Sequence, residues 1–221
     1  MKLQRVRNFE GFTLVELLVS FAIMSLLTGV IVYNQADFSD RVALSNSAGE
    51  VELQIRESQA YGISVREFQQ GSGQFSFAYG VSVNISSNAG ALAPTSYLSF
   101  ADAASPSPND GIYNISGTSW VTGCGSNSEC LKIYSLARNN RISQICVIEA
   151  TGTVNCSSAV TRADITFLRP DPSARITLMA SALNSLNGSF PNFKGARIVL
   201  LSPRGNTKNI DIYRTGQISI Q

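Results

Sequence analysis

The feature that most constrains this chain is an apolar stretch close to its start. Residues 12–33 are 22 in number, and Glu16 is the only charged one among them. At 1.5 Å per residue, a helix of this length covers the roughly 30 Å hydrocarbon core of a bilayer. Lys2, Arg5 and Arg7 precede the stretch and favour a cytoplasmic start. The sequence therefore predicts one membrane-spanning helix, with the rest of the chain on the far side.

A simple membrane anchor does not explain Glu16. A carboxylate in hydrocarbon costs roughly 2.5–3.5 kcal/mol on insertion scales. A secretory signal peptide fits poorly, because the acid lies inside the apolar core and no small-x-small cleavage site follows it cleanly. A plain anchor, whose acid reaches the headgroups, stays open as the second interpretation. The third interpretation rests on a resemblance.

The block GFTLVELLV, residues 11–19, closely resembles the prepilin amino terminus of type IV pilins and type II secretion pseudopilins. The resemblance implies cleavage between Gly11 and Phe12 by a prepilin peptidase, and N-methylation of Phe12. It also implies that Glu16 acts in assembly, its carboxylate pairing with the new amino group of Phe12 in a neighbouring subunit. An opposite charge at contact distance offsets the cost of a buried charge, so such a pair would set register as well as affinity.

Helical periodicity continues beyond the apolar stretch. Apolar or small residues alternate at spacings of four and three, as on one stripe of an amphipathic helix. We expect one helix over residues 12–68, ended by the glycine-containing residues 69–73. The charged residues Glu50, Glu52, Arg56, Glu57 and Glu67 lie mostly off the stripe. The stripe consists of Leu44, Ala48, Val51, Ile55, Ser58, Gly62 and Val65.

The remainder of the chain reads as short strands separated by turns. We expect an α+β, pilin-like fold, in which the long N-terminal helix spans a membrane with its first half and packs on an antiparallel sheet with its second. The expected parts are a leader (1–11), a transmembrane or filament-core helix (12–33), its amphipathic continuation (34–69) and a β-rich head (70–221). The predicted strands are 74–84, 96–100, 111–115, 131–136, 143–148, 153–155, 164–168, 174–179, 196–201, 209–213 and 217–220.

Four cysteines lie in the second half of the chain, namely Cys124, Cys130, Cys146 and Cys156. The even count without a C-x-x-C motif favours structural disulfides outside the cytosol, with free buried thiols as the alternative. Residues 141–156 read as a hairpin around EATG, which brings Cys146 near Cys156. Cys124 and Cys130 bracket a short loop. We therefore expect the pairs 124–130 and 146–156 over the two other pairings.

Two weaker segments resemble the GspH/FimT-type minor pseudopilins. The C-terminal residues 196–221 share with them a strand, a glycine turn and a further strand, although Gln217 replaces the arginine of their T-G-R-I element. Residues 56–65 resemble the helix region of the same proteins. This resemblance implies a minor component of a filament.

The sequence offers little for catalysis. It contains no histidine, which removes the commonest general base and metal ligand, and no nucleotide-binding or nucleophile-elbow motif was found. Asp102, Asn109 and Asp110 are oxygen donors, but their spacing matches no EF-hand, so a solvated turn is the favoured interpretation over calcium binding. We expect no enzyme activity, no cofactor and no metal.

Charge is unevenly distributed, with eleven basic and four acidic residues in 131–221. Arg138, Arg141, Arg204 and Lys208 could contact phosphates, so binding to nucleic acid is the weaker alternative to pairing with the acids of the helix.

The sequence thus predicts a minor pilin or pseudopilin, a structural subunit of a type IV pilus or a type II secretion pseudopilus. It is expected in the bacterial inner membrane with a periplasmic head, then in the filament, with other pilin subunits and the prepilin peptidase as partners. The alternative is a pilus-tip binding subunit, an adhesin or a DNA-uptake minor pilin.

Overall fold

The computed structural model describes residues 11–68, 71, 73–86, 92–103, 108–114, 124, 129–156, 160–180, 186 and 192–221. Its longest element is a single α-helix, α1, Leu14–Ile63. The chain divides into two compact units, Met1–Ser39 and Asp40–Gln221, and α1 contributes to both. The first unit contains the apolar part of α1, and the second, the head, contains the remainder of α1 and all the described strands.

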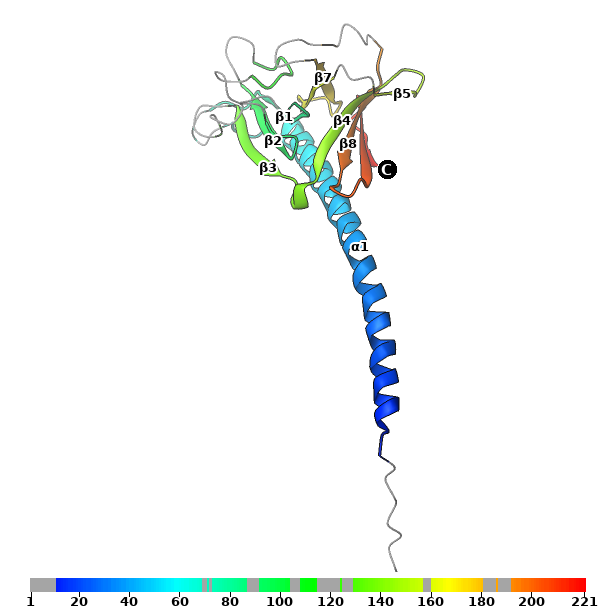
Figure 1. The fold of residues 1–221 in the computed structure, drawn as a ribbon. Helices are drawn as coiled ribbons and strands as arrows, with labels where there is room; N and C mark the ends of the chain where they lie inside the picture. Colours follow the sequence, from blue (N-terminus) through cyan, green and yellow to red (C-terminus); the bar gives the residue numbers. More distant parts are fainter. Residues whose placement is uncertain are drawn as a thin grey trace, which may run out of the picture. The chain divides into compact units, whose positions relative to one another are not determined.

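The described strands of the head form two five-stranded sheets, and every pairing within them is antiparallel. The first sheet has the order β3-β2-β1-β6-β7, and the second has the order β10-β9-β8-β4-β5. In the view of Figure 1, β1, β2 and β3 lie on one side of α1 and β4 and β8 on the other. The strands are β1 Ala78–Asn84, β2 Ser96–Asp102, β3 Cys130–Ser135, β4 Arg141–Ile148, β5 Val154–Asn155, β6 Arg162–Phe167, β7 Arg175–Met179, β8 Gly195–Leu201, β9 Thr207–Tyr213 and β10 Ile218–Ile220.

The predicted helix stripe is the centre of the head's core. Leu44, Ala48, Val51 and Ile55 are each at most 2% exposed, and they share one apolar cluster with side chains from both sheets. Burying a side chain such as Leu or Ile contributes about 1.5–3 kcal/mol, so this part of α1 is held by tertiary packing and not by propensity alone. Ser58 and Gly62 are also buried, as expected, whereas Val65 lies beyond the helix and is exposed.

The central strands of the first sheet, β1 and β6, are covered on both faces, whereas its edge strand β3 is mostly exposed or half-buried. Every residue of β1 and β6 is buried, and a second apolar cluster of Leu92, Leu98, Phe100, Tyr113 and Cys130 lies apart from the main core. β8, in the second sheet, instead alternates between buried and half-buried residues, as expected for a strand with one solvated face. The predicted long helix packed on antiparallel sheet with two disulfides is therefore confirmed, with two sheets in place of one.

Ten of the predicted strands overlap observed ones, and the prediction for 111–115 is wrong over its described residues, 111–114. The reason is that its backbone N–H groups have carboxylate partners in place of a neighbouring strand. Gly111, Ile112, Tyr113 and Asn114 donate in turn to four different carboxylates, those of Asp102, Asp110, Asp164 and Glu129. Ile115 lies outside the described residues.

The helix also ends five residues before the predicted end at residue 68. Gly62 packs directly against β6, where an added Cβ would clash with the carbonyl oxygen of Phe167. Beyond Ile63 the chain turns: Arg66 N–H donates to the Ser64 carbonyl and Phe68 N–H to the Gln74 carbonyl. The close contact at Gly62 therefore fixes the helix against the sheet, and the chain then leaves the helical path. Residues 69, 70 and 72 of the predicted stop signal lie outside the described residues.

Candidate functional site

The start of α1 contains three of the predicted site residues. Gly11 and Phe12 precede the helix, and Phe12 is 75% exposed. Thr13 is the N-cap, because its Oγ1 accepts a hydrogen bond of 3.2 Å from the backbone N–H of Glu16. The Thr13 hydroxyl also lies 3.5 Å from Glu16 Oε2. Thr13 and Glu16 thus have the spacing of a capping box, and the Thr13 hydroxyl satisfies one N–H group, that of Glu16, which the helix itself leaves without a partner.

The cap gives Glu16 a local role that does not depend on a partner subunit. Its carboxylate lies in the first turn of α1, where the helix dipole favours negative charge. The pattern T-L-V-E at residues 13–16 indicates this cap in the sequence, although Thr13 was not among the predicted site residues. The same geometry leaves the Glu16 side chain exposed and only one turn from Phe12. Residues 1–10, the greater part of the predicted leader, lie outside the described residues.

After this cap, α1 presents an apolar surface on all sides. Its large apolar side chains from Leu14 to Tyr33 are between 48% and 84% exposed. The hydroxyls of Ser20 and Thr28 donate to the carbonyl oxygens of Glu16 and Met24, at 2.8 and 2.7 Å. These back-bonds satisfy the hydroxyl donors within the helix, as lipid requires. Among the described residues, α1 is the one helix long and apolar enough to cross a membrane.

The expected solvated turn is wrong for Asp102, which is 0% exposed. Asp102, Asn109 and Asp110 hold the head's loops in place through hydrogen bonds. Asp102 accepts backbone N–H groups of Asn109 and Gly111 at 3.0 and 2.6 Å, and Asp110 accepts that of Ile112 at 2.9 Å. The Asn109 side chain accepts from the backbone of Ala78 at 2.7 Å, and its backbone φ is 63°, in the left-handed region. Over the part of the chain that the structure describes, no group of three or more acidic or cysteine side chains could hold a metal ion.

Burial makes the Asp102 carboxyl a weaker acid than an exposed aspartate. Desolvation is the main cause that raises its pKa to about 7, and the nearby charges of Asp110 and Glu129 add to the effect. The hydrogen bonds from Gly111 and Asn109 act in the opposite direction but do not cancel it. Arg162 and Asp164 form a fully buried ion pair beside this loop, and Arg162 also donates to the Tyr113 carbonyl. The carboxylates of Asp102, Asp110 and Asp164 therefore hold the backbone of residues 109–113 in place.

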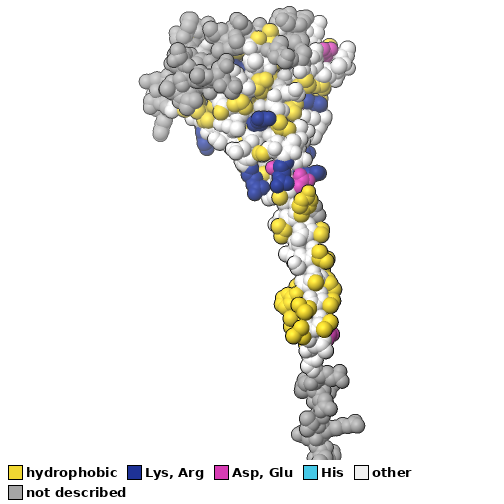
Figure 2. Space-filling view, viewed as in Figure 1, with side chains coloured by type: hydrophobic (Ala, Val, Ile, Leu, Met, Phe, Trp, Pro, Cys, Tyr) yellow, Lys and Arg dark blue, Asp and Glu magenta, His cyan; other side chains and the backbone are white. Residues whose placement is uncertain are grey.

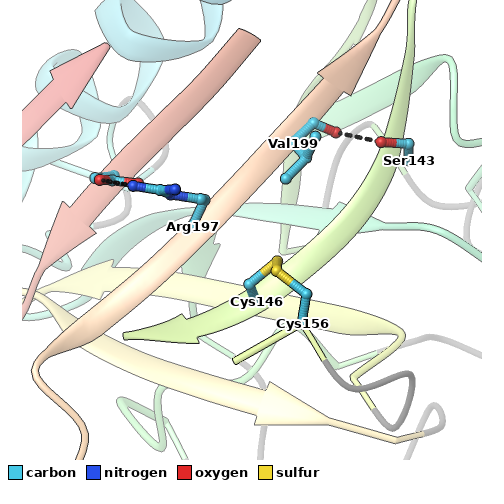
Figure 3. Close-up of a disulfide and its surroundings, with 6 residues drawn as sticks. Ser143, Cys146, Cys156, Arg197 and Val199 are labelled. Atoms are coloured by element: carbon cyan, nitrogen blue, oxygen red, sulfur yellow. Dashed lines mark hydrogen bonds and ion pairs between the residues drawn. A yellow bond between two sulfur atoms is a disulfide. The ribbon is translucent and has the colours of Figure 1, made fainter. Parts of the chain in front are cut away.

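The two disulfides pair as predicted, Cys124 with Cys130 and Cys146 with Cys156. Figure 3 shows the second bridge joining neighbouring strands, with Cys146 on β4 and Cys156 directly after β5. The predicted hairpin is confirmed by the pairing of Val147 with Asn155. On the same sheet, Ser143 lies at a bulge and its hydroxyl donates to the Val199 carbonyl at 3.1 Å (Figure 3).

The four cations considered for nucleic acid lie at one end of the second sheet. Arg138 is in the short 3-10 turn Ala137–Asn139 before β4, and Arg141 is the first residue of β4. Arg204 is in the turn between β8 and β9, and Lys208 is the second residue of β9. Leu201, which precedes this turn, pairs with Arg141, so the structure does bring these segments together. Figure 2 shows Lys and Arg side chains gathered with a few acids on the lower edge of the head.

Comparison with known proteins identifies the N-terminal segment. Residues 6–32 match the family model described as the prokaryotic N-terminal methylation motif. No curated protein and no solved structure matches the chain. The match covers the capped start and most of the exposed apolar surface of α1, so the chain is type IV prepilin-like in this segment.

Proposed function

We propose that this type IV prepilin-like chain is a minor pilin or pseudopilin, a structural subunit of a type IV pilus or a type II secretion pseudopilus. The observation that carries the proposal is the match at residues 6–32, which coincides with an apolar helix surface exposed on every side. An exposed surface of this size in a described helix needs lipid or other subunits to cover it. Both are supplied in turn when a pilin-like subunit is first inserted in a membrane and then assembled.

In this proposal a prepilin peptidase cleaves between Gly11 and Phe12, and the new N-terminus of Phe12 is methylated. The geometry supports access, because both residues precede α1 and Phe12 is largely exposed. Residues 1–11 are then the leader, 12–33 the membrane or filament-core helix, 34–69 its continuation and 70–221 the head. The head lies on the periplasmic side, which the two disulfides support, since disulfides persist in oxidising compartments.

Glu16 is the assembly residue in this proposal. Cleavage creates a positive amino group on Phe12, and the Glu16 carboxylate of one subunit pairs with that group on the next. The pair compensates two charges that would each be costly in an apolar filament core. The cap made with Thr13 holds Glu16 at the helix start before a partner arrives.

The C-terminal segment supports a minor subunit of the GspH/FimT type. Gly216 has φ +86° and forms the turn between β9 and β10, where Tyr213 N–H donates to the Gln217 carbonyl at 2.8 Å. Gln59 of α1 donates to the carbonyl oxygens of Pro172 and Gly216 at 2.9 and 3.4 Å, which fastens this turn to the helix. The two segments with the weaker resemblance, 56–65 and 196–221, are therefore joined in the fold. The stoichiometry of the chain in isolated filaments tests the minor role: a share equal to that of the main subunit would exclude it.

Processing is tested by expressing the full chain with and without a prepilin peptidase and determining the N-terminal residue by mass spectrometry. We expect the mature chain to begin at N-methylated Phe12 only when the peptidase is present. Gly11→Leu should block cleavage, whereas the matched control Gly29→Leu, also at an open position on the chain, should not. Mature protein beginning at Met1 in the presence of an active peptidase would overturn the proposal.

A further inference from the structure

Three arginines of the head differ from the other described arginines because their side chains have no close ion pair, hydrogen bond or ring contact with another described residue; two of them, Arg138 and Arg204, interact at longer range with Asp40. Among the described residues, Arg138, Arg141 and Arg204 are exposed and form no ion pair within 4.0 Å. Other described arginines have a carboxylate, carbonyl, hydroxyl or ring as partner: Arg56 with Glu52, Arg162 with Asp164, Arg197 with Asp211, Arg169 with Ser76, Arg175 with Asn109, Arg66 over Tyr61 and Arg214 over Phe193. These three exposed arginines, called the arginine cluster below, keep their guanidinium groups available to an external anion.

The arginine cluster is held in place by two asparagine contacts to α1. Asn140, next to the turn that carries Arg138, donates from its side chain to Ser47 at 3.0 Å and is fully buried. Asn206, in the turn that carries Arg204, donates from its side chain to Asp40 at 3.2 Å. Arg138 and Asn139 adopt left-handed backbone with φ of 55° and 56°, which non-glycine residues seldom do. The surrounding structure therefore imposes this turn, and with it the position of Arg138.

One acid of the head lies close to the cluster. Hydrogen bonding from Ser202 is the main cause that lowers the pKa of Asp40, followed by Asn206, Arg204 and Arg138. Asp40 is therefore ionised at neutral pH and balances one of the three cations. The cluster keeps an excess of positive charge.

Its position along the chain indicates what the cluster faces. Asp40 is seven residues after Tyr33, the last residue of the apolar stretch. Seven residues span about 10 Å at the helical rise and no more than about 25 Å when extended. While residues 12–33 cross a bilayer, this edge of the head is therefore tethered close to the headgroup layer. The electric field of anionic lipid acts over about 10 Å at ordinary salt.

We propose that the arginine cluster is a membrane-contact surface that binds the phosphate groups of anionic lipids in the bilayer that holds the apolar helix. This inference rests on the proposed membrane insertion of residues 12–33. The contact holds the head near the membrane before assembly, and it is released when the subunit is extracted into a filament. Each cation near an anionic surface contributes a factor of about five in affinity. Binding of the arginine cluster to the lipid is therefore weak enough to be reversible.

Hydrogen exchange of the full chain in lipid nanodiscs tests the proposal. Discs of phosphatidylcholine alone are compared with discs that also contain phosphatidylglycerol. In the anionic discs we expect amide exchange in residues 137–142 and 202–206 to slow about fivefold or more, and this protection to disappear at about 1 M salt, where screening acts over only about 3 Å.

A pair of charge-matched variants makes the test specific. Arg138→Gln with Arg204→Gln should abolish the lipid-dependent protection. The control, Lys194→Gln with Arg214→Gln, removes two exposed cations beside the opposite ends of β8 and β9 and should keep it. Equal exchange in both kinds of disc, or protection that survives in the first variant, would overturn the proposal.

Two further outcomes distinguish the membrane contact from its alternatives. A chain that enters both discs without any lipid-dependent difference refutes the membrane contact alone, whereas a chain that enters neither refutes the proposed membrane insertion and this inference with it. Duplex DNA at low salt is the remaining probe. Protection of the same two turns by DNA, without protection by anionic discs, would show that the arginine cluster binds nucleic acid and not lipid.

Discussion

The two halves of α1 have the same backbone conformation but are built on opposite principles. Up to Tyr33 the helix is apolar on every side, and its large side chains are exposed. From Asp40 onward one stripe is buried in the head, and the other faces carry polar residues with isolated apolar ones such as Leu53. The comparison shows that the sequence of the second half fits the core of the head. The apolar side chains of the first half have no such cover among the described residues, and in our proposal lipid or neighbouring subunits cover them.

The largest expected effect comes from placing a charge on the buried stripe. Val51→Asp puts an unpaired carboxylate where the wild-type side chain is 0% exposed, and it should lower the free energy of unfolding of the head by about 4 kcal/mol or more. Leu53→Asp, two residues away and 68% exposed in the wild type, should change it by no more than about 0.5 kcal/mol. Denaturant unfolding in detergent micelles measures both, and equal losses would show that the stripe does not hold the head.

The disulfide on the second sheet should have the next largest effect. Replacing Cys146 and Cys156 by serine opens a loop with a sequence separation of 10 and should cost the head about 2–3 kcal/mol on the loop-entropy model. The same double substitution should leave the helix content of the apolar half of α1 in lipid unchanged. Thermal unfolding followed by near-ultraviolet circular dichroism reports the head specifically. No change in the unfolding temperature of the double variant would contradict a structural role for this bridge.

The head should also respond to pH through Asp102. Because its pKa is raised to about 7, the native state binds more protons than the unfolded state between about pH 4 and pH 7. The stabilising effect of protonation is complete at low pH and is lost as the pH rises through this window, by up to about 1.4 kcal/mol per pH unit. Unfolding measured at several pH values should show this slope, and Asp102→Asn should flatten it. An equal slope in both proteins would assign the titration to another group.

The smallest effect should come from the cap of the apolar half. Thr13→Ala removes the hydroxyl that accepts from Glu16 N–H and should destabilise the first turn of α1 by about 1 kcal/mol. Thr13→Ser keeps the hydroxyl and serves as the control. Exchange of the first-turn amides in micelles should accelerate about fivefold in the alanine variant only. Identical exchange in both variants would show that Thr13 does not cap the helix.

Much of this structure was predictable from periodicity and motif, and the failures have identifiable causes. The buried stripe from Leu44 to Gly62 followed from the alternation of four and three, because core burial imposes that period. The disulfide Cys146–Cys156 followed from hairpin geometry, and Cys124–Cys130 followed from the short loop between its cysteines. Residues 111–114 were wrongly assigned to a strand because their N–H groups bond to carboxylates, and one of these, Asp164, is so distant in sequence that no local pattern encodes the contact. Thr13 was missed although its pattern is local. The helix ends early because the backbone N–H of Phe68 pairs with Gln74, a contact that the helical period of the sequence does not encode.

In our proposal, the apolar half of α1 packs against neighbouring subunits, and the Glu16 carboxylate pairs with the Phe12 amino group of the next subunit. Substitution of Glu16 by glutamine tests the contribution of this ion pair alone. Glutamine occupies the same place in a capping box but has no charge, so the helix start is retained while the pair with the Phe12 amino group is lost. The measurement is the amount of mature chain in purified filaments, relative to the amount in the membrane, for the wild type and Glu16→Gln with equal processing. We predict at least a tenfold fall in the variant, as expected for the loss of a compensated buried charge. Normal incorporation of Glu16→Gln would refute the role of this ion pair in joining the subunits.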